Sequence, residues 1–232
     1  MKLPLAIFLS ATLAGSAAVV VAAPGIDAPI NKREAAAAWS AEGLRPVGNT
    51  RLDLVYARGD ADLSVYRSVH LAPVDVVFQH QWERRLLSNT GTRIRPTELS
   101  QIKQDVADAV HDQVARELAK GGLQVVDTGG PGVLEIELRV VELYLNAPDL
   151  PTVNLTRNYA RSFGEMTLVA ELRDGGSGAL LMRSLDRTLG RDFGQFRRFT
   201  RVENSMEVGS VASDWARALR KELDLAKPIS QS

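Results

Sequence analysis

Two carboxylates and an arginine are the residues of this chain best suited to acid/base chemistry. Glu165, Asp186 and Arg187 lie in two alternating apolar and polar stretches, 164–173 and 180–189, that predict a β-hairpin turning at 174–178. Two carboxylates beside a guanidinium can transfer protons, so one hypothesis is a hydrolase acting through Glu165 and Asp186. The alternative is structural: a register with Leu172 opposite Leu180 would pair Glu165 with Arg187 across the strands.

A second candidate site is an arginine cluster that follows the hairpin. The stretch 191–201 reads RDFGQFRRFTR and contains Arg191, Phe193, Phe196, Arg197, Arg198, Phe199 and Arg201. Guanidinium groups bind phosphate and carboxylate, and phenylalanines can enter an apolar surface, so the pattern indicates contact with an anionic ligand or a membrane. The simpler interpretation is a solvated connection whose phenylalanines pack on the core.

Metal and nucleotide chemistry find little support in the sequence. His70, His80 and His111 are far apart, and none has a second ligand at metal-binding spacing, so we expect no metal and no cofactor. The glycine-rich stretches 129–132 and 175–178 lack a Walker lysine and a serine nucleophile elbow, and we expect turns there. Because the chain has no cysteine, disulfides and thiol catalysis are excluded.

Charge and composition limit the function classes further. The 232 residues include 28 Lys and Arg against 28 Asp and Glu, so no overall positive field would attract nucleic acid. A content of 45% hydrophobic and 24% charged residues is typical of a globular domain with one core. Any anionic partner would therefore need a local basic patch.

The N-terminal segment predicts export. Lys2 precedes an uncharged apolar run, residues 3–23, that ends in the small residues a signal peptidase reads. Cleavage near Ala22 would release a periplasmic protein, whereas the uncut segment is long enough to anchor the protein on the periplasmic side of a membrane. Ser16 stands where a lipoprotein signal has its cysteine, and because lipidation needs a thiolate, it is excluded at this residue.

The elements that must position these residues are two amphipathic helices and a sheet. Apolar residues at helical spacing predict helices over 98–120, after Thr97 as cap, and over 205–223, after Asn204 as cap. Alternation predicts strands over 52–56, 68–78, 123–127 and 133–145 as well as the hairpin. Pro73 is expected at a sheet edge, and a phase slip near Val140 predicts a β-bulge. The expected fold class is α+β: a two-layer, mostly antiparallel sheet with two amphipathic helices packed on one face.

The same pattern divides the chain into four parts. We expect a signal peptide or anchor at 1–23, a tether at 24–50 fixed by Trp39, a single α+β domain at 51–226 and a tail at 227–232. A connection of about seventeen residues, 146–162, is long for such a domain and is a candidate functional loop.

Three blocks of sequence carry a resemblance to a known family. They are LDLVYARGDADLSVYRSVHLAPVDVVF (52–78), LYLNAPD (143–149) and RSFGEMTLVAELRDGGSGALL (161–181). Together they resemble a bacterial cell-envelope family of unknown function whose members are commonly named lipoproteins. The resemblance implies export and an envelope location, but no activity and no catalytic residues. The family's lipobox cysteine is replaced here by Ser16.

The sequence therefore favours a non-enzymatic periplasmic or envelope-associated protein, a binding or assembly module. The expected partner is an envelope protein, an anionic envelope polymer or lipid, and not nucleic acid. The alternative is a hydrolase acting on envelope material through carboxylates near Glu165 and Asp186. Neither the ligand nor the oligomeric state follows from the residues.

Overall fold

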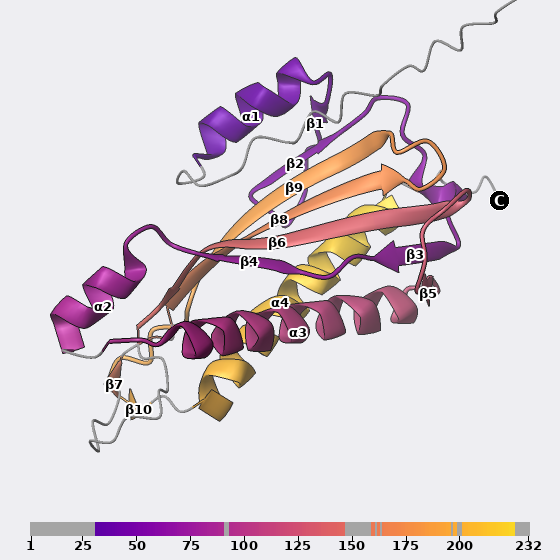
Figure 1. The fold of residues 1–232 in the computed structure, drawn as a ribbon. Coiled ribbons are helices and arrows are strands. Elements are labelled where there is room, and N and C mark those ends of the chain that lie inside the picture. Colours follow the sequence, from indigo (N-terminus) through magenta and orange to yellow (C-terminus); the bar gives the residue numbers. More distant parts are fainter. Residues whose placement is uncertain are drawn as a thin grey trace, which may run out of the picture.

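One twisted sheet carries two long helices on one face and a short helix on the other (Figure 1). The computed structural model describes residues 31–90, 93–146, 159–160, 162, 164–195, 197–198 and 201–225. The α-helices there are α1 (Lys32–Ala41), α2 (Trp82–Thr90), α3 (Pro96–Lys120) and α4 (Arg201–Leu225). A short 3-10 helix, η1, spans Leu63–Val65.

Eight strands form the main sheet in the order β1-β2-β9-β8-β6-β3-β5, with β4 also pairing with β6. Their bounds are β1 Arg45–Pro46, β2 Leu54–Ala57, β3 Ser68–Leu71, β4 Asp75–Phe78, β5 Gln124–Val126, β6 Val133–Leu145, β8 Gly164–Asp174 and β9 Leu180–Leu189. Neighbouring strands in the series β1-β2-β9-β8-β6 pair antiparallel. Strand β3 pairs parallel with β6 and with β5, and β4 pairs parallel with β6. A separate pair joins β10 (Arg197–Arg198) to β7 (Tyr159–Ala160). The expected α+β fold with a mostly antiparallel sheet is confirmed.

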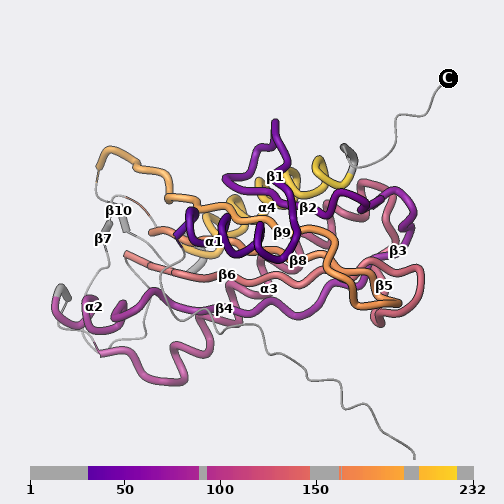
Figure 2. The backbone as a smooth tube through the Cα atoms, turned by 90° about the horizontal axis from the view of Figure 1, so that it is seen from above, coloured from indigo at the N-terminus to yellow at the C-terminus, as the bar shows by residue number. Residues whose placement is uncertain are grey.

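The main core lies between the sheet and the two long helices. Every second residue of β6 and β8 points to this face, because side chains alternate along a strand. The buried positions include Leu134, Ile136, Leu138 and Val140 on β6, Met166, Leu168, Ala170 and Leu172 on β8, Val106, Val110, Val114 and Leu118 on α3, and Val208, Ala212, Trp215 and Leu219 on α4. Figure 2 shows α3 and α4 running beneath the same strands. The apolar stripes of the sequence thus form one helical layer.

The opposite sheet face has its own smaller core under α1. Trp39 is 7% exposed and packs with Leu44, Val141, Val169 and Leu185. Its ring meets that of Tyr56 edge to face, with centroids 5.6 Å apart. Part of the segment expected to be a tether, from Lys32 to Pro46, therefore packs on the sheet as α1 and β1. Residues 24–30 lie outside the described part.

Several local predictions need correction. The stretch 68–78 forms two strands because residues 72–74, with Pro73, interrupt it. Helix α3 begins at Pro96 with Arg95 at the N-cap, where Glu98 accepts the Arg95 backbone N–H, so Thr97 is not the cap. Helix α4 begins at Arg201, three residues before the expected cap. Helix α2 was not expected.

The β-bulge and the hairpin register also differ in detail from expectation. The break in β6–β8 pairing falls between Val141 and Tyr144, where Glu142 has a φ of 53°, close to the phase slip expected near Val140. In the hairpin, Leu172 faces Met182 rather than Leu180, so the expected register was wrong by two residues. The residues from Asp174 to Gly178 form the turn, where the Gly178 N–H donates to the Asp174 carbonyl.

Candidate functional site

Glu165 and Arg187 form an ion pair on the sheet face that α1 partly covers. Arg187 Nη2 donates to Glu165 Oε2 at 2.9 Å, and Gln79 Nε2 donates to Glu165 Oε1 at 3.1 Å. The pair is diagonal rather than directly opposite, because Glu165 faces Leu189 and Arg187 faces Thr167 across the strands. The hydrogen bond from Arg187 to the Glu165 carboxylate also raises the pKa of Arg187 above its usual value.

Asp186 lies on the other face of the sheet, so the two carboxylates do not share a site. Asp186 faces Leu168 of the main core, whereas Glu165 is on the opposite parity of the hairpin. The Trp215 indole N–H donates to Asp186 Oδ2 at 2.7 Å, and the Asp53 backbone N–H donates to Oδ1 at 3.1 Å. The hydrolase hypothesis built on Glu165 and Asp186 is therefore wrong in its geometry: strand alternation separates the two groups.

A chain of polar contacts links the start of α1 to α2 across the ends of β9 and β8. Lys32 Nζ lies 2.6 Å from Asp53 Oδ2, and the Arg187 backbone N–H donates to the same oxygen at 3.0 Å. At the far end, Arg85 Nη1 donates to Gln79 Oε1 at 3.0 Å. The members in order are Lys32, Asp53, Arg187, Glu165, Gln79 and Arg85. We call this series the polar chain.

The polar chain holds Asp53 in its charged form. Partial burial alone would raise the pKa of the Asp53 carboxyl, but the hydrogen bonds from Lys32 and from the Arg187 backbone outweigh burial and lower that pKa below its usual value. Asp53 therefore stays ionised between two cationic residues. This fixes the first turn of α1 to the end of the sheet where α2 lies.

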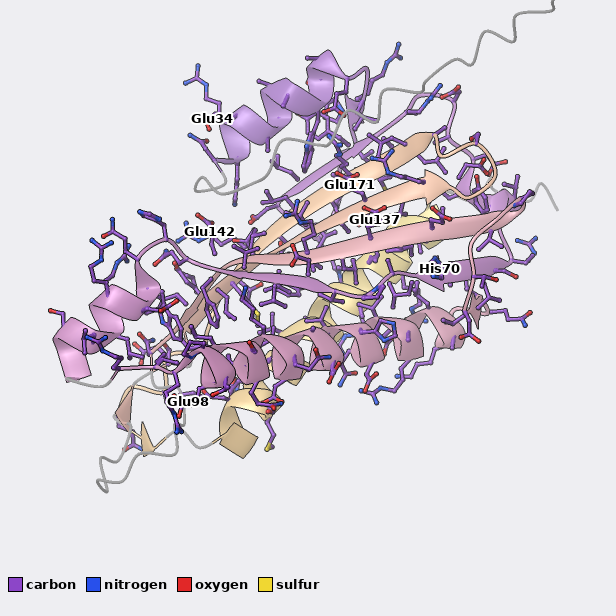
Figure 3. The ribbon with its side chains drawn as sticks, viewed as in Figure 1. Glu34, His70, Glu98, Glu137, Glu142 and Glu171 are labelled. Carbon is purple, nitrogen blue, oxygen red and sulfur yellow. The ribbon has the colours of Figure 1, made fainter. Side chains whose placement is uncertain are left out.

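Three arginines around α2 lack a carboxylate partner among the residues that the structure describes. Arg84 and Arg93 line a surface hollow of about 740 Å³, together with His80, Leu87 and Ile94. Arg85 binds only neutral oxygens, those of Gln79 and of the His80 backbone. Arg95, by contrast, is paired with Glu98 near the start of α3 (Figure 3). Glu83 also lines the hollow, which thus combines two guanidinium groups without an ion pair in the described structure, one carboxylate and the exposed apolar side chain of Leu87.

The arginine cluster of the sequence belongs to the same end of the molecule, although the structure describes only part of it. Arg191 is exposed and Phe193 is half-buried against the main core. Arg197 and Arg198 form β10, and Arg201 is the first residue of α4. Phe196 and Phe199 lie outside the described residues. Figure 1 places α2, β7, β10 and the first turns of α3 and α4 together.

We call this region, residues 79–98 and 187–201, the basic end. The first stretch contains four arginines and two glutamates, and the second contains five arginines and one aspartate, although the whole chain has zero formal net charge. Sequence reasoning missed the arginines of α2 because the helix has only nine residues. The available signal was the i, i+4 pair Trp82 and Leu86, both buried, which places Arg84 and Arg85 on the solvent side.

The described residues hold no group of three His, Asp or Glu side chains that could bind a metal ion. His70 on β3 (Figure 3), His80 before α2 and His111 on α3 belong to different elements. Within the described ranges, the helices are also too short or too polar to cross a membrane. The expected signal or anchor at 1–23, with Ser16, and the loop at 147–158 lie outside these ranges.

The fold and the site define an α+β module with an ion-paired sheet face and a basic end. The chain belongs to the family of proteins of unknown function DUF3313, which residues 38–219 match, so the resemblance seen in the sequence is confirmed. Similar solved structures include the PelC dodecamer from Paraburkholderia phytofirmans, at 12% identity, covering 72% of this chain and 96% of that one, with a TM-score of 0.37. A minor lipoprotein from Acinetobacter baumannii is 13% identical, with coverages of 68% and 95% and a TM-score of 0.28. No curated protein sequence matches the chain.

Proposed function

We propose that this protein is a non-catalytic, envelope-associated binding module whose basic end contacts an anionic membrane surface on the periplasmic side. The observation that carries the proposal is the polar chain, which fixes the start of α1 to the end of the sheet that bears α2 and its unpaired arginines. The start of α1, which follows the apolar run in the sequence, therefore lies toward the same end of the sheet as α2.

Few residues separate the apolar run from α1 in the sequence. Eight residues, 24–31, separate the apolar run from α1. Eight extended residues span at most about 29 Å. If the apolar segment stays in the membrane, the start of α1 lies within that distance of the bilayer surface, and the basic end lies beside it. An uncut apolar segment would anchor the chain by itself, and the basic end would then hold the domain against the anionic surface.

The energetics favour a weak, salt-sensitive contact. A basic residue near an anionic bilayer contributes about 1 kcal/mol, and the attraction decays over about 8–10 Å at physiological salt. Arg84, Arg85 and Arg93 can contribute fully, because no ion pair within the described structure must break first. Leu87 of α2 is 37% exposed and can enter the headgroup region without exposing the core.

Hydrogen–deuterium exchange of the full chain on lipid vesicles tests the proposal whether or not the N-terminal segment is cleaved. We expect the amides of α2 to be protected on phosphatidylglycerol vesicles but not on phosphatidylcholine vesicles, with protection lost at high salt. The double variant R84Q/R93Q should lose this difference. The control R67Q/R116Q removes two exposed arginines that lie outside the basic end and should keep it. Equal exchange of α2 on both kinds of vesicle would refute the proposal.

A further inference from the structure

A second cationic site lies at the opposite end of the sheet, where the β8–β9 hairpin turns. A groove of about 720 Å³ is lined there by Arg45 of β1, Arg58 after β2 and Arg173 of β8. Gly43, Leu44 and Leu180 form part of its wall. Strand β8 has eleven residues, so the groove is separated from the basic end by roughly 30 Å. A cavity of this size suits a small molecule.

The carboxylates that line the groove are already neutralised. Arg58 donates to both oxygens of Asp60, from Nε at 3.1 Å and from Nη2 at 3.3 Å. Glu42 receives Arg183 Nη1 at 2.7 Å on each oxygen. These contacts leave Asp60 and Glu42 little capacity to repel an incoming anion.

Arg173 is also engaged. Its Nη2 donates to Glu171 Oε2 at 2.7 Å, and Nη1 donates to the Gly178 carbonyl at 3.3 Å. Glu135 stands directly opposite Arg173 on β6. Arg173 is therefore held in place by its ion pair with Glu171 and is not a free donor.

Arg45 is the free donor of the groove. Its side chain has no hydrogen bond or ion pair within the part of the chain that the structure describes. The pairing of Arg45 with Ala57 fixes its backbone, and its guanidinium group lies over Gly59, where a Cβ would stand 3.7–3.8 Å from the guanidinium atoms. Gly43 has a φ of 86° and opens onto empty space. The fork of Arg45 thus faces a cavity that glycines keep open.

We propose that this groove binds the oxyanion group, carboxylate or phosphate, of a small ligand, with Arg45 as the main donor. A guanidinium group presents two parallel N–H donors that match either oxyanion. Leu44 and Leu180 provide an apolar surface for the remainder of such a ligand. The site is independent of the membrane contact proposed above, because it is built from other residues at the other end of the sheet.

The test is a titration of the isotope-labelled full chain in zwitterionic detergent, followed by the amide NMR signals of Gly43 and Gly59. The probes are sodium phosphate and sodium glucuronate, each compared with sodium chloride at equal ionic strength. We expect saturable shifts of both glycine signals with at least one probe. A response to phosphate alone or to glucuronate alone identifies the source of the oxyanion, and both results support the site.

Matched variants separate specific binding from general attraction. R45Q should weaken binding by about tenfold or more, since a charge-assisted hydrogen bond is lost. R45K keeps the charge without the fork and should bind with intermediate affinity. The control R116Q removes an exposed arginine of α3 and should bind like the parent. Equal affinity of R45Q and parent, or no shift of the glycine signals with either probe, would overturn the proposal.

Discussion

Replacing Trp39 by alanine tests whether α1 is an integral part of the fold. A tryptophan side chain buries about 150–250 Å², which at about 25 cal/mol per Å² gives an upper limit of about 4–6 kcal/mol. Large-to-small substitutions of buried aromatic residues cost about 3–5 kcal/mol. Because Trp39 is 7% exposed and is the main contact of α1 with the second core, we expect W39A to lower the free energy of unfolding by about 3 kcal/mol.

Urea unfolding gives the measurement, read by far-UV circular dichroism and by fluorescence of the remaining tryptophans. Trp82 and Trp215 are 1% and 2% exposed and report the main core in the variant. W39F, which keeps an aromatic ring against Tyr56, should lose only about 1 kcal/mol. M206A, at a side chain that is 68% exposed, should change stability by less than about 0.5 kcal/mol. A loss below about 1 kcal/mol for W39A would refute the reasoning, because α1 would then contribute nothing to the fold.

Three further predictions concern single side chains. The hydrogen bond from the Ser177 hydroxyl is the main cause that lowers the pKa of Asp174 from the ordinary 3.8 to about 2. S177A should therefore be less stable than the parent at neutral pH, and urea titrations should show this difference vanish as the pH falls from 3.8 to about 2. Burial raises the pKa of Glu222 above 4.5, so its ionisation opposes folding as pH rises, and E222Q should gain melting temperature relative to the parent between pH 4.5 and 7. At Gly164, with a φ of 142°, a Cβ would overlap the Tyr144 carbonyl, so G164A should lower the melting temperature strongly while G209A, at an uncrowded helical glycine, should not.

Most of the fold could be predicted because its long elements carry strong periodic patterns. The buried valines of α3 recur at four-residue spacing, and the inward residues of β6 and β8 alternate, which gives helix and strand unambiguously. The hairpin register could not be fixed in this way. A shift of two residues keeps every side chain on its own face, so alternation cannot distinguish Leu172 opposite Leu180 from Leu172 opposite Met182.

The candidate site was harder to predict because its contacts join distant parts of the chain. The alternation of side chains along a strand is enough to place Glu165 and Asp186 on opposite faces of the hairpin, so the sequence itself argues against a shared site. The ion pair of Arg183 with Glu42 spans 141 residues, and that of Lys32 with Asp53 depends on how α1 crosses the sheet. Local patterns show neither contact. Arg45 was overlooked because its significance comes from lacking a partner within the described structure, which only a three-dimensional arrangement reveals.

Helix α1 connects the two proposed sites. Its first residue, Lys32, pairs with Asp53 toward the basic end. Glu42 follows the last residue of the helix and pairs with Arg183 beside the groove that Arg45 lines. Trp39 holds the helix to the sheet between these contacts. If the basic end rests on a membrane, the groove opens at the far end of β8, roughly 30 Å away. A small anionic ligand bound there would be held clear of the negatively charged lipid surface, which would otherwise repel it.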